Sequence, residues 1–186
     1  MNYIEKTLTF ESDKIYFTEE ETQLEVMMDW EHPLMSASAA YICEEGGDIL
    51  EIGFGMGISA GYIQSHSISS HTIIENHPQI ITKAQEWANG KSNVNIITES
   101  WYSVKDDLST YDGLFYDTYG DENNINFSSS LSSLMKTGGK ATWWNNNASN
   151  NDIFNIPNLT WQEINISPST NSYFNSSTYY LPKKQF

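Results

Sequence analysis

The chain of 186 residues contains no arginine, and its nine basic residues are all lysines. Aspartate and glutamate together number 24, which gives a formal net charge of −15. Binding to nucleic acid depends on Lys and Arg side chains that neutralise phosphates, and Lys183 and Lys184 form the only adjacent basic pair. We therefore expect no nucleic-acid partner, and instead a small or cationic one.

Cysteine and long hydrophobic runs are scarce too. The single cysteine, Cys43, cannot form a disulfide within the chain. No apolar run approaches the ~20 residues that a membrane-spanning helix needs, and residues 1–14 lack the basic and apolar regions of a signal peptide. These features predict a cytoplasmic protein without a membrane partner, and we expect a monomer or a homodimer.

The middle of the chain alternates short apolar runs with amphipathic ones. Strands are expected over residues 48–52, 71–75, 93–98, 111–117 and 141–144, and helices over 58–65, 79–88 and 126–136. This alternation predicts an α/β fold in which a mainly parallel sheet is flanked by helices. Two further runs, 161–166 and 173–181, are expected to close the sheet as an antiparallel pair, with a loop at 145–151.

The N-terminal part carries two helix signals. Thr18 followed by Glu21 has the pattern of a capping box, which predicts a helix running through Leu24 to Met28. Pro33 predicts a second helix over 34–44, with Glu31 at the bend between the two. We expect one domain over 1–186, composed of an N-terminal helical segment (1–45), which the family resemblance given below implies to be a lid, a cofactor-binding core (46–145) and a C-terminal segment that closes the sheet (146–186).

Three glycines follow the first expected strand, at positions 53, 55 and 57. Glycine there permits a tight turn and a close approach of backbone to ligand. The spacing differs from the G-x-G-x-x-G that places a pyrophosphate on a helix N-terminus, so it favours a nucleoside without phosphates, such as S-adenosylmethionine, over NAD. Glu75 ends the next strand, near the ~20-residue spacing of an acid that binds ribose. An ordinary strand-to-helix turn is the alternative.

Three more polar or aromatic positions follow expected strands at the same edge of the sheet. Trp101 could cover an adenine ring that Ser100 reaches, or could pack in the core. Asp117 ends a largely apolar strand, where it could bind a ligand or cap a helix. The four histidines have no metal-ligand spacing, so no metal site is expected.

Four segments carry a family resemblance: VMMDWEHPLM at 26–35, LEIGFGM at 50–56, TIIEN at 72–76 and LFYDTY at 114–119. In them, and over about residues 24–145, the sequence resembles guanidinoacetate N-methyltransferase and related enzymes that methylate the internal guanidino nitrogen of arginine. The resemblance implies a Rossmann-like class I methyltransferase with a seven-stranded sheet, an N-terminal helical lid and S-adenosylmethionine as cofactor.

The resemblance also implies the roles of individual residues. The implied cofactor contacts are Met27, Met35, Glu51, Gly53, Phe54, Gly55, Met56, Gly57, Ile58, Ser59, Glu75, Asn76, His77, Ser100, Trp101 and Asp117. The implied substrate contacts are Glu31, Asp117, Thr118, Tyr119, Asn147 and Ala148. Glu31 and Asp117 would hold the guanidinium, which pairs well with carboxylates. Because the guanidinium must lose a proton to become nucleophilic, we expect Asp117 to act as the base.

The sequence departs from the family at the C-terminal side. Asn147 and Ala148 stand where the family has a Thr-Ser pair that receives the carboxylate of guanidinoacetate, and the C-terminal segment looks shorter. The leading hypothesis is therefore a methyltransferase acting on a small guanidino compound, guanidinoacetate-like. The alternatives are arginine, free or in protein, a nucleobase amine, or a non-catalytic module that binds S-adenosylmethionine. Acidity and the absence of an N/D-P-P-Y/W motif after the fourth core strand disfavour the nucleobase.

Overall fold

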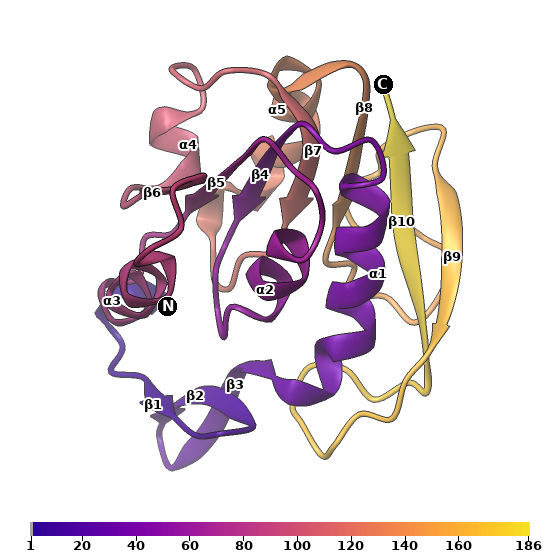
Figure 1. Cartoon of the computed structure of the whole chain (residues 1–186). Coiled ribbons are helices and arrows are strands. Elements are labelled where there is room, and N and C mark those ends of the chain that lie inside the picture. The colour runs from indigo at the N-terminus through magenta and orange to yellow at the C-terminus, as the bar shows by residue number, and fades with distance from the viewer. Residues whose placement is uncertain (1) are drawn as a thin grey trace.

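The computed structural model describes residues 2–186, which form a seven-stranded sheet with helices on both faces (Figure 1). The strand order is β6-β5-β4-β7-β8-β10-β9. The strands are β4 (Asp48–Ile52), β5 (Ser70–Ile74), β6 (Val94–Ile97), β7 (Tyr111–Tyr116), β8 (Met135–Trp143), β9 (Thr160–Asn165) and β10 (Thr178–Gln185). Strands β4 to β8 pair in parallel, whereas β10 is antiparallel to both β8 and β9. The predicted mainly parallel sheet with an antiparallel closing pair is confirmed.

Helices precede or connect the parallel strands. They are α1 (His32–Ile42), α2 (Ile58–Gln64), α3 (Pro78–Ala88), α4 (Trp101–Val104) and α5 (Phe127–Leu134), with short 3-10 turns η1 (Tyr3–Glu5), η2 (Asp29–Glu31) and η3 (Glu122–Asn126). The helix expected over 126–136 ends at Leu134, because β8 begins at Met135. Strand β8 is therefore longer than the expected 141–144, and α4 is a short helix that we did not expect.

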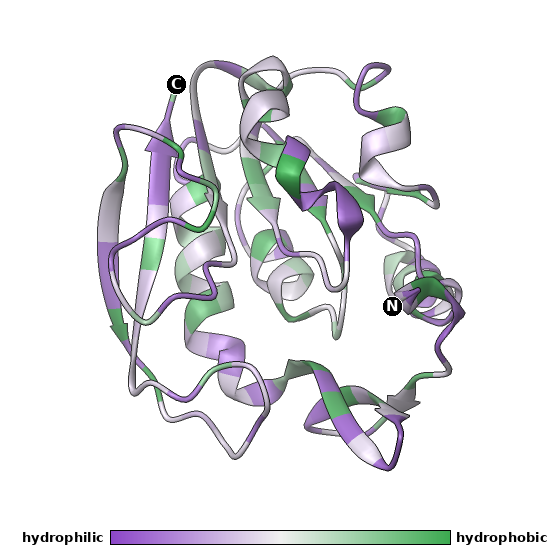
Figure 2. Cartoon of the chain, turned by 180° about the vertical axis from the view of Figure 1, so that it is seen from behind, coloured by the Kyte–Doolittle hydropathy of each residue, from purple (hydrophilic) through white to green (hydrophobic). Residues whose placement is uncertain are grey.

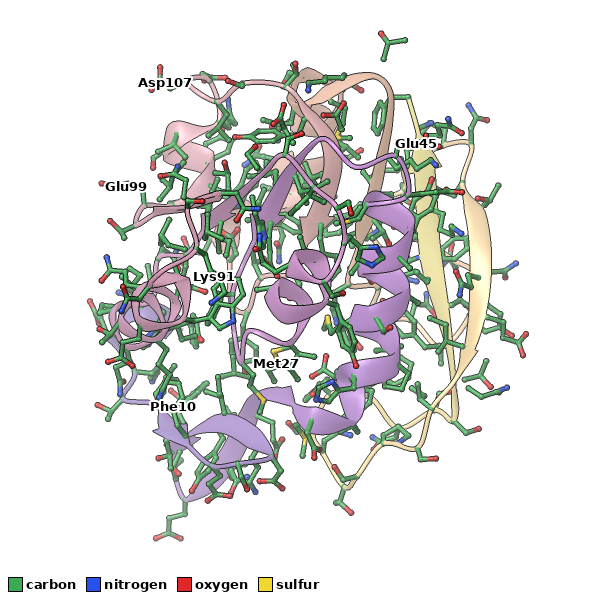
Figure 3. The ribbon with its side chains drawn as sticks, in the orientation of Figure 1. Phe10, Met27, Glu45, Lys91, Glu99 and Asp107 are labelled. Atoms are coloured by element: carbon green, nitrogen blue, oxygen red, sulfur yellow. The ribbon has the colours of Figure 1, made fainter. Side chains whose placement is uncertain are left out.

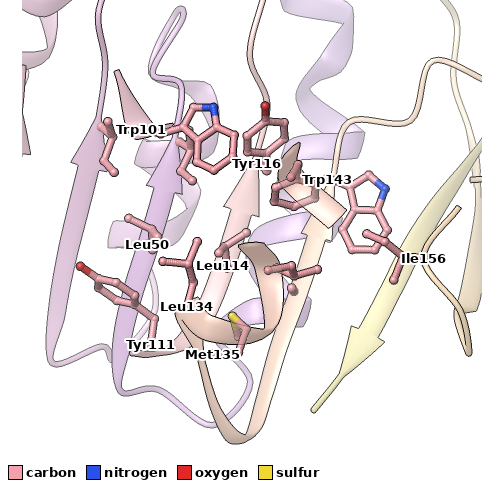
Figure 4. Packing of buried hydrophobic residues seen from close by; sticks show 14 residues of the cluster. Leu50, Trp101, Tyr111, Leu114, Tyr116, Leu134, Met135, Trp143 and Ile156 are labelled. Carbon is pink, nitrogen blue, oxygen red and sulfur yellow. The ribbon is translucent and has the colours of Figure 1, made fainter. Parts of the chain in front are cut away.

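Successive residues of the central strands face opposite layers of the fold. On β4, Ile49 packs with Met35 of α1 and Ile63 of α2, whereas Leu50 packs on the side of α5. Figure 4 shows this second cluster, in which Leu50 lies near Leu114 of β7. Hydrophobic residues gather on the central strands, and the connecting loops are mainly hydrophilic (Figure 2). A strand buried on both faces reads as a continuous apolar run, which is why these strands were predictable.

The helix expected over residues 18–28 is wrong. This segment belongs to a three-stranded antiparallel sheet of β1 (Thr9–Phe10), β2 (Lys14–Glu19) and β3 (Thr22–Met28). Glu20 and Glu21 have φ of 47° and 67°, so the acidic pair forms the hairpin turn between β2 and β3 and not a helix cap. Ile15 and Phe17, each 1% exposed, bury one face of β2. Burial of alternate residues outweighs the local helix signal, and the N-terminal segment is helical at η1 and from Asp29 onward.

The C-terminal segment also differs from expectation. Strand β10 begins at Thr178 and not at residue 173, so residues 166–177 form a loop between β9 and β10. The run 145–151 is a loop, as expected. Among residues 2–186 no helix combines the length and the apolarity needed to cross a bilayer.

Candidate functional site

A cavity of about 470 Å³ opens at the carboxyl ends of β4, β5 and β7. Open α/β sheets bind their ligands at this edge. The predicted site residues that line the cavity are Met27, Gly53, Phe54, Gly55, Ser59, Glu75, Asn76, Ser100, Trp101, Asp117, Thr118 and Tyr119. They come from β3 and from the ends of four core strands, so residues distant in sequence meet around one space.

The glycine loop after β4 is held close to two other segments. Gly53 has φ of 93°, and a Cβ atom there would lie 1.8 Å from the carbonyl oxygen of Asp117. A Cβ atom on Gly55 would lie 2.5 Å from the sulfur of Met27. Met27, labelled in Figure 3, also accepts a hydrogen bond from the backbone N–H of Met56, at 3.1 Å from its sulfur. These contacts explain why glycine is required at both positions.

The carboxylate of Glu75, at the end of β5, is fixed by backbone donors. One oxygen accepts from the N–H of Phe54 at 2.9 Å, and the other from the N–H groups of Asn76 and His77, each at 2.9 Å. An ionised carboxylate accepts about four hydrogen bonds. Glu75 is 7% exposed and lines the cavity, so its remaining capacity is available to a ligand hydroxyl.

Trp101 both packs in the core and lines the cavity. Its side chain is 3% exposed, and its ring meets Tyr116 edge to face at 5.5 Å. The indole N–H donates to Asp121, which fixes the plane of the ring. Ser100 precedes α4 beside it, and Glu99, labelled in Figure 3, adds a further acidic group to the lining. The two interpretations of Trp101 are therefore compatible.

Glu51 lies beneath the cavity and not in its lining. It is fully buried, accepts a hydrogen bond from the hydroxyl of Ser59, and lies 2.9 Å from Nε2 of His71. These contacts connect β4 to α2 and β5. The other predicted cofactor residues outside the lining are Met35, Met56, Gly57, Ile58 and His77.

Glu31, which is buried, and Asp117, which is partly buried, form a pair of acids next to the cavity. Glu31 ends η2 and is 3% exposed, whereas Asp117 follows β7 and lines the cavity. Burial, and then the charge of Asp117, raises the pKa of Glu31. Burial, and then the charges of Glu51 and Glu75, raises the pKa of Asp117. Within residues 2–186 neither acid forms an ion pair with a lysine.

The predicted substrate residues are separated by the structure. Thr118 and Tyr119 line the cavity beside Asp117. Asn147 lies in the loop after β8 and accepts hydrogen bonds from the backbone and hydroxyl of Ser149, and Ala148 is exposed. Neither Asn147 nor Ala148 lines the cavity.

Two tyrosines were missed by the sequence reasoning. Tyr3 of η1 lines the cavity and is 6% exposed, and its hydroxyl has no hydrogen-bond partner among residues 2–186. Burial, and then the charge of Glu75, raises its pKa. Tyr173, in the loop 166–177, donates a hydrogen bond of 2.7 Å to Glu31. No motif surrounds either residue, so the sequence offered no signal for them.

The described part of the chain contains no group of three or more His, Cys, Asp or Glu side chains arranged to hold a metal ion.

A sequence model of the family described as guanidinoacetate N-methyltransferase matches residues 8–151 of the chain. A relative from Aspergillus oryzae, named protein arginine N-methyltransferase 2, is 34% identical over 154 residues, which are 77% of this chain and 36% of the relative. A protein of the same name from Kluyveromyces lactis is 28% identical over 217 residues, covering 99% of this chain and 53% of that protein. The chain thus spans between about a third and about half of these curated relatives.

Solved structures with the same fold are distant in sequence. The N-methyltransferase NodS from Bradyrhizobium japonicum, in complex with S-adenosylhomocysteine, matches with a TM-score of 0.63 and 12% identity, over 84% of this chain and 87% of that one. Spermidine synthase from Thermotoga maritima matches with a TM-score of 0.65 and 10% identity, over 96% of this chain and 72% of that one. These likenesses show the fold alone.

Proposed function

Because the chain belongs to the guanidinoacetate N-methyltransferase family, we propose that it is an S-adenosylmethionine-dependent N-methyltransferase that acts on a guanidino group. One observation carries the proposal: the buried Glu31 and the partly buried Asp117 interact electrostatically beside the cavity, without a lysine partner in residues 2–186. The chain has no arginine, so no guanidinium of its own can neutralise them. A buried carboxylate without a partner is costly, which favours a cationic ligand.

The cavity fits the proposed cofactor. Its volume of about 470 Å³ lies within the usual range for small-molecule sites. The backbone of Gly53 and Gly55 permits close approach, Glu75 has acceptor capacity for a ribose hydroxyl, and the buried hydroxyl of Tyr3 needs a partner. When bound, S-adenosylmethionine supplies a methyl group on a positively charged sulfonium, and an acidic lining suits that charge.

In the proposed mechanism, Glu31 and Asp117 bind and orient the planar guanidinium through its N–H groups. Asp117 reaches the cavity whereas Glu31 does not, so Asp117 is the acid that can face the nitrogen undergoing methylation. Burial and neighbouring acids raise the pKa of Asp117, which makes it a stronger base. Asp117 accepts the proton that the guanidinium loses, and fixed alignment supplies a large part of the rate.

We propose arginine as the acceptor. The names of the curated relatives support this choice. Asn147 and Ala148 support it too, because they lie outside the cavity lining, and Ala148 offers no side-chain donor to the carboxylate of a short acceptor. Guanidinoacetate is the second candidate, favoured by the description of the matching family.

The test is methyl transfer from labelled S-adenosylmethionine to free arginine, an arginine peptide, agmatine and guanidinoacetate in parallel, with Glu31→Gln as the control. Label in arginine or the peptide, lost in the variant, supports the proposal. Label in guanidinoacetate alone replaces arginine by the second candidate. Binding of S-adenosylhomocysteine without transfer to any of the four would contradict a guanidino methyltransferase and favour a binding module.

A further inference from the structure

The loop between β9 and β10 reaches back to the N-terminal part of the chain. The backbone N–H and the hydroxyl of Ser172 donate to Glu25 of β3, at 3.1 Å and 2.6 Å. Next to it, the hydroxyl of Tyr173 donates to Oε1 of Glu31, and its ring stacks on Trp30 with 5.8 Å between ring centres. Two successive residues of this loop therefore contact two glutamates that are distant in sequence.

The conformation that presents Tyr173 is fixed within the loop. The side-chain oxygen of Asn171 accepts from the backbone N–H groups of Tyr173 at 2.9 Å and Phe174 at 2.6 Å. Its side-chain nitrogen donates to the carbonyl of Phe174 at 2.8 Å. An Asn that bonds the backbone two and three residues onward holds a tight turn. The hydroxyl of Tyr173 is thus directed at Glu31 by a built turn.

The two oxygens of Glu31 are used unequally. Oε1 accepts from the backbone N–H of Met28 at 2.8 Å and from Tyr173 at 2.7 Å. Oε2 accepts no hydrogen bond within residues 2–186, and neither does the carboxylate of Asp117. We propose that Tyr173 is a positioning residue that occupies Oε1, so that Glu31 offers only Oε2 to an acceptor guanidinium while both oxygens of Asp117 stay available.

This inference rests on the proposed function and adds an orientation to it. A guanidinium held by one oxygen of Glu31 and by both oxygens of Asp117 has one preferred rotation, with its Asp117 side towards the cavity. Without the Tyr173 hydroxyl, Glu31 can pair with the guanidinium through both of its oxygens. It then competes with Asp117 for the same two N–H groups. The hydroxyl also stabilises the ionised form, which lowers the pKa of Glu31 against the larger effect of burial.

The test is Tyr173→Phe, which keeps the aromatic ring and removes the hydroxyl. In the cofactor-free protein, we expect the midpoint of the Glu31 titration, followed by carbon NMR of the glutamate carboxyls and identified with Glu31→Gln, to move to higher pH. With arginine as acceptor, we expect kcat to fall by roughly 10-fold to 100-fold, as for the loss of a hydrogen bond to a charged group. The acid limb of the rate profile should move to higher pH.

Tyr180→Phe is the matched control, because the Tyr180 hydroxyl of β10 makes no hydrogen bond within the described residues. Tyr173→Phe should bind S-adenosylhomocysteine like this control. If titration and kcat also equal those of Tyr180→Phe, or if kcat falls without a shift in the titration, the proposal is overturned. If the wild type methylates no guanidino compound, the proposed function fails, and the NMR titration alone still decides whether Tyr173 positions Glu31.

Discussion

The protein supplies different numbers of hydrogen-bond donors to the acids on the two sides of the site. Glu75, on the proposed cofactor side, receives three backbone N–H donors from the segments that build the cavity. On the proposed acceptor side, Glu31 receives one backbone donor and the Tyr173 hydroxyl, and the Asp117 carboxylate receives none within residues 2–186. The backbone therefore satisfies most of the hydrogen-bonding capacity of the acid on the first side, whereas the acids on the second side have few protein donors, so their ionised forms gain most from a cationic ligand.

The largest expected effect comes from the acceptor side. Asp117→Asn should lower kcat for methyl transfer by roughly 10²-fold to 10⁴-fold, the usual contribution of a general base. The affinity for S-adenosylhomocysteine should change much less, because Glu75 and the glycine loop are untouched. Calorimetry and steady-state kinetics measure the two effects separately.

Asp106→Asn is the matched control, since the Asp106 side chain is 86% exposed. It should leave both quantities unchanged. If Asp117→Asn retained the wild-type kcat, Asp117 would not be the base, and the two sides of the site would no longer differ in chemical role.

The second effect concerns stability and its dependence on pH. Burial and Asp117 raise the pKa of Glu31 above its ordinary value of 4.5, so the folded protein retains a proton that the unfolded chain releases. This contribution to the free energy of unfolding is complete below pH 4.5 and is lost as pH rises through the raised pKa. Chemical denaturation of the ligand-free wild type should show that loss, and Glu31→Gln should be less sensitive to pH over the same range.

Glu45→Gln supplies the comparison, because it removes one negative charge from a side chain that is 77% exposed. Its stability curve should stay parallel to that of the wild type. If the Glu31→Gln curve is equally parallel to that of the wild type, ionisation of Glu31 does not lower the free energy of unfolding. Glu31 and Glu75 would then no longer differ in how well the fold stabilises their charge.

The cofactor side was largely predictable from the sequence, because its signals are local. A buried strand followed by glycines, and an acid at the end of the next strand, predicted Gly53, Gly55, Gly57 and Glu75, and all of these except Gly57 line the cavity. Asp117 was predictable for the same reason, since it directly follows an apolar strand. Parallel strands bring such positions to one edge of the sheet whatever the intervening chain does.

What the sequence did not predict depends on contacts between distant segments. The helix expected over 18–28 rested on Thr18 and Glu21, but the burial of Ile15 and Phe17 against the rest of the fold selects strands. Tyr173 reaches Glu31 across 142 positions of the chain, and Tyr3 meets the cavity through η1. Local patterns do not encode such distances, so half of the hydrogen-bond partners of Glu31 were outside the reach of sequence reasoning.

Tyr3 is the exception on the cofactor side, and it gives the smallest expected effect. Its hydroxyl is buried, lines the cavity region beside Glu75 and lacks a partner among residues 2–186. If a bound nucleoside is that partner, Tyr3→Phe should weaken the affinity for S-adenosylhomocysteine by about 2-fold to 10-fold, the usual value of one hydrogen bond. The ligand-free variant should be as stable as the wild type or more so, because an unsatisfied buried hydroxyl is removed.

Titration calorimetry and thermal unfolding without ligand measure these two opposite changes. Tyr16→Phe is the control, since among residues 2–186 the Tyr16 hydroxyl bonds only to Glu11, in an exposed pair. If Tyr3→Phe lowers the affinity but not the stability of the ligand-free protein, Tyr3 contacts the ligand. A packing defect would lower both the affinity and the stability. Unchanged affinity together with lower stability would make Tyr3 part of the core, and the backbone donors to Glu75 would then account for the cofactor side without help from η1.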